Sequence, residues 1–374
     1  MFLLLAEALR LPTVSERLPG SRFWEFLAYH QSHVEWVGCA LHDMIQPGFS
    51  FLVGAALAFS IANRARSGQS RLRMTGHAFG RAVALVFLGI FLRSLGHAQT
   101  HFTFVDTLTQ IGLGYFFLYL LGERPVRDQV IALAVILFGY WGAFALHPLP
   151  GPEFDPTAVG VPKDWPHALG GFAAHWNKNS NLAWAFDVWF LNLFPREEPF
   201  RFDAGGYATL SFVPTLGTML LGLLAGELLR SERTARAKAS VLFLAGLASL
   251  VLGSALGELG VCPVVKRIWT PSWVLWSGGL CFLALGAFYV AVEILRARAL
   301  AFPLVVFGRN SIAAYLMAWL ASGFVARNLE VHLGRGAFLV FGEPYETLVR
   351  GGLTVLVLWT ALYCMYRKRI FLKI

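Results

Sequence analysis

Charged side chains are scarce in this chain. Asp, Glu, Lys and Arg together make up 14% of its 374 residues, whereas hydrophobic residues make up 56%. An ordinary soluble domain has roughly 25% charged residues. The composition therefore excludes an ordinary soluble protein and favours a membrane protein.

Cysteine is also rare, and none of the four residues stands at the spacing of a zinc or redox motif. Cys281 and Cys364 fall in apolar runs, where we expect plain packing roles. Cys39 and Cys262 fall on segments expected to face outward, where an oxidising compartment permits a disulfide. Their pairing stays open, because a sequence does not give the distance between them.

The chain lacks an internal repeat, a low-complexity tract, a soluble domain and a recognisable signal peptide. Residues 1–11, MFLLLAEALRL, are apolar from the first position, have no basic leader and are too short to cross a bilayer. We expect them to be the outer half of a first helix whose beginning is missing.

Long apolar runs are present throughout, each near the roughly 20 residues that cross a bilayer. They predict nine full spans, at 46–64, 81–96, 104–122, 128–146, 208–230, 238–258, 274–296, 302–325 and 348–366. With the partial first helix, the intact protein would have about ten. The predicted fold is all-α: a polytopic transmembrane helix bundle, forming a single integral membrane domain over residues 1–374.

Basic residues predict the orientation of the spans. The short connections 64–81, 122–128, 230–238 and 296–298 and the tail Arg367-Lys368-Arg369 are basic, and all fall on one side if the spans alternate. That side is predicted to be cytoplasmic, together with the C-terminus. The excess of Lys and Arg is then a topology signal with anionic lipid contact as a by-product, and nothing indicates nucleic acid.

The one long connection, 147–207, is predicted to face outward as an ordered cap. It is rich in Pro, Gly and aromatic residues, and a disordered linker would not hold so many tryptophans. We expect an interfacial helix near 180–194.

The richest chemistry is expected in His33–Gly54, HVEWVGCALHDMIQPGFSFLVG, where polar residues run directly into an apolar helix. Ionisable groups at the mouth of a membrane helix are costly and are functional candidates. His33 could act as a base, nucleophile or acyl carrier, and Asp43 could orient a histidine. The alternative is that both are interfacial polar residues bonded to backbone.

Other polar groups have weaker claims. Glu7 lies near the outer end of the partial helix, where pairing or snorkelling would explain it. Zinc binding by His30, His33, His42 and Asp43 lacks a closed ligand spacing, so we expect no metal. His97 and His101, four residues apart, are more typical of an interface than of a ligand pair. Intramembrane polar residues form either a cavity lining or helix–helix hydrogen bonds; they are Asp106, Thr109, Gln110, Arg309, Asn310 and Ser311.

Five sequence blocks, in order, resemble the family of heparan-alpha-glucosaminide N-acetyltransferase and its bacterial relatives. The first is His33, Trp36, Gly38, Asp43 and Pro47 followed by FSFLVG. The others are LTQIGLGY (108–115), Phe212-Val213-Pro214 running on to Gly226, PVVKRIWTPS (263–272) and FGRNSIAAY (307–315). They cover most of the chain from His33 to about Tyr315.

The resemblance implies transfer of an acetyl group from cytosolic acetyl-CoA, as co-substrate, to an amino sugar or other envelope glycan across a bacterial inner membrane. It implies His33, in an extracytoplasmic loop, as acetyl acceptor or general base, with Asp43 or Glu7 orienting it. Residues expected to bind substrate are Trp36, Gln110, Lys266, Arg267, Trp269, Asn310 and Ser311. Glu7 stands where the family has Asn, and Val265 also stands where the family usually has Asn.

Three interpretations remain at this stage. An acyl-histidine intermediate and direct transfer both fit the enzyme reading. A transporter or channel would use the same polar residues as a pathway, although paired broken helices in inverted repeats are not found. A non-catalytic membrane protein derived from an enzyme family is the third. The acceptor, the acyl chain length and a homodimer are left open.

Overall fold

The computed structural model describes residues 1–372, and within that range the regular secondary structure is helical, with a single isolated β-bridge between Val37 and Val265. Seven of the described helices are long and apolar enough to cross a membrane, and a bent helix pair raises the number to eight. The predicted all-α, multi-pass bundle is confirmed.

The described chain forms two compact units. The first contains Met1–Val34, Cys39–Ile45 and the C-terminal part from Ala291, and the second contains Glu35–Gly38 and Gln46–Val290. The prediction of a single domain stays a prediction.

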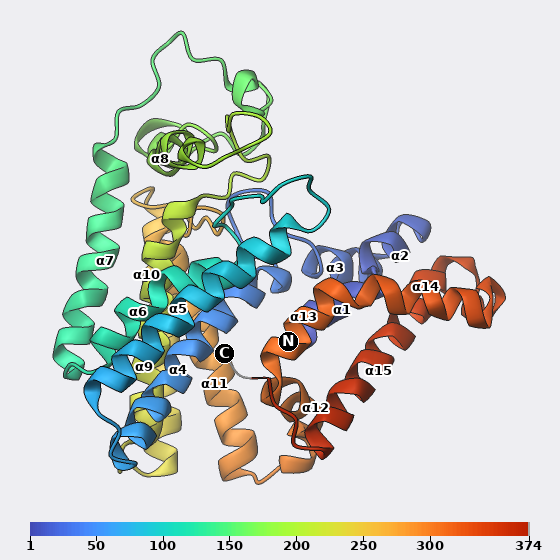
Figure 1. Cartoon of the computed structure of the whole chain (residues 1–374). Helices are drawn as coiled ribbons and strands as arrows, with labels where there is room; N and C mark the ends of the chain where they lie inside the picture. Colours follow the sequence, from blue (N-terminus) through green and yellow to red (C-terminus); the bar gives the residue numbers. More distant parts are fainter. Residues whose placement is uncertain (373–374) are drawn as a thin grey trace. The chain divides into compact units, whose positions relative to one another are not determined.

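The second unit is a bundle of seven helices under a cap. Its helices are α4 (Ile45–Arg66), α5 (Arg71–Ser94), α6 (Thr107–Gly122), α7 (Val126–Leu146), α9 (Phe212–Arg230), α10 (Ala235–Glu258) and α11 (Pro271–Tyr289). Figure 1 shows the connections after α4, α6 and α9 at one end of the bundle and the 147–207 segment at the other. The basic connections of this unit therefore share an end, as the alternation of spans predicts.

Helices α4 and α9 approach each other closely at glycines. A Cβ on Gly222 would run into the backbone of Phe51, and one on Gly226 would meet the backbone of Ala55. Small residues allow this approach in membrane helices, where packing has to replace a hydrophobic drive. Glycines in the 216–226 run thus bring α9 against α4.

The cap is ordered by aromatic packing. It contains η3 (Pro156–Val159), η4 (Gly171–Trp176), α8 (Leu182–Phe190) and η5 (Leu191–Leu193), and η6 (Thr209–Ser211) leads into α9. Trp36, Trp165 and Trp176 share one buried cluster with Phe144 at the end of α7 and Val265 in the α10–α11 connection. A helix is present near 180–194, as α8 and η5; its predicted interfacial position stays a prediction.

The first unit joins both ends of the chain. Its N-terminal elements are α1 (Phe2–Ala6), η1 (Glu7–Leu9), α2 (Leu11–Arg17), α3 (Arg22–His30) and η2 (Leu41–Met44). Its C-terminal elements are η7 (Val290–Ile294, a π-turn that begins at the last residue of the second unit), α12 (Arg298–Arg309), α13 (Ser311–Leu320), α14 (Ser322–Leu333), η8 (Arg335–Phe338), η9 (Glu343–Tyr345) and α15 (Glu346–Arg367). Leu5 of α1 packs with Val306, Ala314 and Leu358 in one buried cluster.

The structure differs from the expected nine spans at two places. The run 302–325 is no straight helix: α12 and α13 meet at a 71° bend, and α14 follows. Helix α6, at 16 residues, is shorter than the other bundle helices. Apolar composition predicts neither the bend between α12 and α13 nor the residue at which a helix such as α6 ends.

Candidate active site

The side chains of Asp43 and His33 are in contact in the segment that precedes α4. Oδ1 of Asp43 lies 2.7 Å from Nδ1 of His33, and its Oδ2 accepts the backbone amides of Ala40 at 2.9 Å and Val34 at 3.3 Å. The Asp43 side chain is 1% exposed and that of His33 is 39% exposed. Because a carboxylate only accepts, Nδ1 of His33 carries the proton, and Nε2 is the basic nitrogen of the neutral ring.

A second histidine–carboxylate pair lies beside the first. Nε2 of His42 is 2.9 Å from Oε1 of Glu7, with the histidine 8% exposed and the glutamate 52% exposed. The ring centroids of His33 and His42 are 4.6 Å apart. The structure therefore brings the three predicted catalytic residues Glu7, His33 and Asp43 into one cluster and adds His42 to it.

Gln31 ties together the segments that carry the cluster. Its Nε2 donates to the Ala6 carbonyl at 2.6 Å, and its Oε1 accepts the Leu11 amide at 2.5 Å. These bonds fasten the residues on either side of η1, where Glu7 lies, to the end of α3, two residues before His33. Nearby backbone amides thus position Asp43, whereas Glu7 is positioned by a side-chain link from a distant part of the sequence.

Sequence reasoning gave His42 a role only as a metal ligand. Its partner Glu7 lies 35 positions away in the chain, so spacing carries no signal of the pair. Among residues 1–372, no group of three or more His, Cys, Asp or Glu side chains is arranged to hold a metal ion.

Five residues expected to bind substrate lie in the second unit. Trp36 is fully buried and donates its indole N–H to the Trp176 carbonyl at 3.1 Å. Gln110, also fully buried, donates to the carbonyls of Phe104 and Thr209. These contacts tie Trp36 to the cap and α6 to the segment that leads into α9, and a substrate role for either residue stays a prediction.

The PVVKRIWTPS block is largely enclosed. Lys266 is 5% and Trp269 2% exposed. Trp269 donates its indole N–H to the Thr218 hydroxyl at 3.0 Å, and Arg267 donates to the Gly205 carbonyl at 2.8 Å and stacks on Tyr207. This block joins the α10–α11 connection to α9 and the cap; its predicted substrate contacts stay predictions.

Asn310 and Ser311 lie in the first unit at the α12–α13 bend. Asn310 is 1% exposed, donates to the Ile370 carbonyl at 2.8 Å and accepts the Leu372 amide at 3.0 Å. The side chain thereby fastens the tail to the bend, and Ser311 begins α13. Their predicted substrate contacts also stay predictions.

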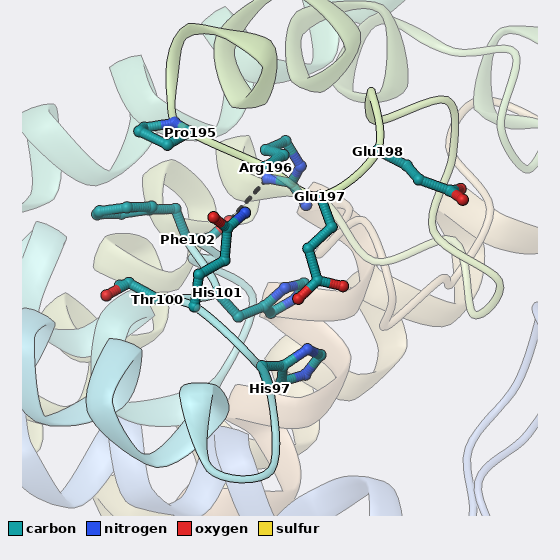
Figure 2. A pocket seen from close by; sticks show the side chains of 9 residues that line it. His97, Thr100, His101, Phe102, Pro195, Arg196, Glu197 and Glu198 are labelled. Atoms are coloured by element: carbon teal, nitrogen blue, oxygen red, sulfur yellow. Dashed lines mark hydrogen bonds between the residues drawn. The ribbon is translucent and has the colours of Figure 1, made fainter.

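His97 and His101 line a separate pocket of about 240 Å³ in the second unit, with Phe102, Arg196 and Glu197 among its walls (Figure 2). The two imidazoles stack with centroids 4.3 Å apart. Burial, followed by the neighbouring His97 and Arg196, lowers the pKa of His101. This pocket is lined by none of the residues of the Glu7–His33–His42–Asp43 cluster.

The cysteines differ in their exposure. Cys262 and Cys281 are buried, whereas Cys364 is exposed. Cys39 lies in the first unit and Cys262 in the second, and their pairing stays open.

The fold and this cluster define a multi-pass helical membrane protein with paired histidine–carboxylate groups. The chain is 23% identical over 394 residues to heparan-alpha-glucosaminide N-acetyltransferase of Homo sapiens, covering 95% of this chain. It is 21% identical over 403 residues to the Mus musculus enzyme of the same name, again over 95% of the chain. The chain spans 57% of the length of each of these curated relatives.

These comparisons confirm the resemblance that the five sequence blocks predicted. No family model matches the chain. Both relatives are N-acetyltransferases by name.

Proposed function

We propose that this protein is a membrane acyltransferase in which His33 carries the acyl group. The main support for this proposal is the 2.7 Å contact between His33 and the buried carboxylate of Asp43. It favours the tautomer in which Nε2 holds the lone pair, and the His33 side chain is 39% exposed, so the imidazole is accessible to a substrate. Acyl-histidine formation divides one difficult transfer into two easier steps.

In the first step, Nε2 of His33 attacks the thioester carbonyl of the donor. A C–N bond forms, the C–S bond breaks, and the thiolate leaves with the bonding pair. The imidazole keeps its Nδ1 proton and becomes a cation, which the Asp43 carboxylate stabilises. The buried carboxylate is already in place, so no reorganisation is needed when the charge develops.

The donor is proposed to be cytosolic acetyl-CoA and the acceptor an amino sugar of the cell envelope. This assignment rests on the names of the relatives and on the sequence resemblance. The basic connections of the second unit support a cytoplasmic location for that end of the bundle, and the cluster is then assigned to the extracytoplasmic side of a bacterial inner membrane.

The experiment is a transfer assay on the full chain reconstituted in lipid vesicles. Radiolabelled acetyl-CoA and glucosamine are supplied on opposite sides, and labelled N-acetylglucosamine is measured. His33→Ala is expected to abolish transfer, whereas His332→Ala, which changes an exposed histidine on α14, leaves it intact. Equal transfer by the His33→Ala variant would remove His33 from the mechanism, and no transfer by the wild type with any amino sugar would contradict the class.

A further inference from the structure

The two histidines of the cluster contact their carboxylates through different ring nitrogens. His33 gives Nδ1 to its carboxylate, whereas His42 gives Nε2 to Glu7. In the neutral tautomers that these bonds select, the basic nitrogen is Nε2 on His33 and Nδ1 on His42. Their rings are 4.6 Å apart and inclined by 48°. Two bases of the same type, each backed by an acid, thus share one small region.

While His33 carries the acyl group, it cannot also accept a proton from the acceptor. Once Nε2 carries the acyl group and Nδ1–H is held by Asp43, the ring has no lone pair left to accept a proton. An amine that attacks the acyl carbon must still lose a proton to become an amide. A second base close to the first ring accelerates this step by taking the proton while the amine attacks, provided that it lies within hydrogen-bond reach of the attacking atom, directly or through one water.

We infer that His42, held by Glu7, is the general base of the second half-reaction. This role of His42 rests on the proposed acyl-His33. The neutral amine attacks the acyl carbon, a C–N bond to the acceptor forms, and the bond to His33 Nε2 breaks, returning its electron pair to that nitrogen. The proton lost by the amine goes to Nδ1 of His42. The resulting imidazolium is stabilised by the Glu7 carboxylate, which makes Glu7 a positioning residue.

The exposed fractions of His42 and Glu7 fit these two roles. His42 is 8% exposed, so its ring is fixed, whereas Glu7 is 52% exposed and offers a route for the proton to water. The cluster also holds Asp43, whose carboxylate already serves His33 and two backbone amides. His30 is occupied differently, because its Nδ1 accepts the Leu41 amide at 3.2 Å.

The test separates acyl loading from acyl discharge. Purified full-length protein in lipid nanodiscs is treated with radiolabelled acetyl-CoA, the donor is removed, and loss of protein-bound label is followed after addition of glucosamine. His42→Gln is expected to load at the wild-type rate but to discharge about 100-fold more slowly, the usual size of a general-base contribution. Glu7→Gln, which keeps a hydrogen-bond acceptor for His42, should give a smaller loss of the same step.

A weakly basic acceptor distinguishes a base from a structural role. O-Methylhydroxylamine loses its proton to water during attack without help from a base. It should therefore discharge the His42→Gln variant nearly as fast as the wild type. Slow discharge with both acceptors would assign His42 a structural role and overturn the inference.

The failure of the inference is distinguishable from that of the proposed function. If the wild type becomes labelled and the His42→Gln variant is discharged by glucosamine as fast as the wild type, only the role of His42 is overturned. Absence of label on the wild type overturns the acyl-His33 route, and the role of His42 with it.

Discussion

The side-chain amide of Gln31 donates to the carbonyl of Ala6 at 2.6 Å, directly before Glu7 in the chain. This bond and the one from Leu11 connect residues that the sequence separates by 25 and 20 positions, respectively. The position of Glu7 relative to the histidines therefore depends on a residue that takes no part in chemistry.

Gln31→Ala removes both bonds. We expect acyl loading of His33 to be close to wild type and discharge to fall roughly 10-fold, because Glu7 no longer holds His42 firmly. Gln69→Ala, in the connection between α4 and α5, is the control and should change neither step. Equal discharge rates in the two variants would show that Gln31 does not position Glu7.

The contact of η1 with α15 gives a second prediction. A Cβ on Gly351 would collide with the backbone of Ala8 and Leu9, whereas one on Gly352 would meet nothing within 4 Å. Gly351→Ala should lower the free energy of unfolding by about 1–3 kcal/mol, as overpacking does, and displace η1 with Glu7.

Gly352→Ala is the matched control, one residue along the same helix. It should leave stability unchanged or raise it by up to about 1 kcal/mol, since alanine favours helix. Thermal unfolding in detergent measures both. Equal midpoints for the two variants would contradict the close approach.

Asp43→Asn tests the electrostatic part of the site. An asparagine carbonyl can still accept a backbone amide, but the side chain cannot balance a charged imidazole. We expect the rate of acyl loading to fall roughly 100-fold or more with little change in the amount of folded protein. Single-turnover loading measures the rate, and size-exclusion chromatography the fold. An unchanged rate would show that Asp43 serves only to bind backbone.

The cap carries a pH-dependent element. Asp187 on α8 is buried and accepts the Thr209 amide at 2.8 Å, and burial raises its pKa from 3.8 to about 6. The folded state thus binds the proton more tightly than the unfolded state. Its stabilising contribution is fully present below pH 4 and is lost as the pH rises through about 6.

Asp187→Asn should remove this dependence. Between pH 5 and pH 8 the wild type should lose about 1.4 kcal/mol that the variant keeps, since pH 5 lies about one unit below the folded-state pKa and one unit corresponds to about 1.4 kcal/mol. Unfolding midpoints at both pH values measure the difference, and Asp164→Asn, on an exposed residue of the same cap, should behave as the wild type. Parallel pH profiles for wild type and Asp187→Asn would contradict the assignment.

The sequence predicted the bundle helices well because apolar length is a direct requirement of the bilayer. It missed the start of α5 by ten residues: Arg71 and Arg73 lie in a helix that Ser70 caps outside the apolar run. It also missed the bend at Asn310. Apolarity records which residues lie in a membrane but not the direction in which a helix runs.

The cluster was predictable only in part. Asp43 could be matched to His33 because both lie in one short polar segment at the mouth of a helix. The role of His42 was hidden because it depends on Glu7, which reaches it through the packing of η1 against α15 and the link made by Gln31. Such long-range contacts leave no local pattern in a single sequence.

The most direct test of the account is the location of the acyl group. Wild-type protein is incubated with radiolabelled acetyl-CoA, digested, and the labelled peptide is identified by mass spectrometry. The account predicts one acetyl group on the imidazole of His33, absent from His33→Ala and present in His332→Ala. An acetyl group on any other residue, or turnover of donor and amino sugar without a labelled protein, would contradict the acyl-His33 mechanism.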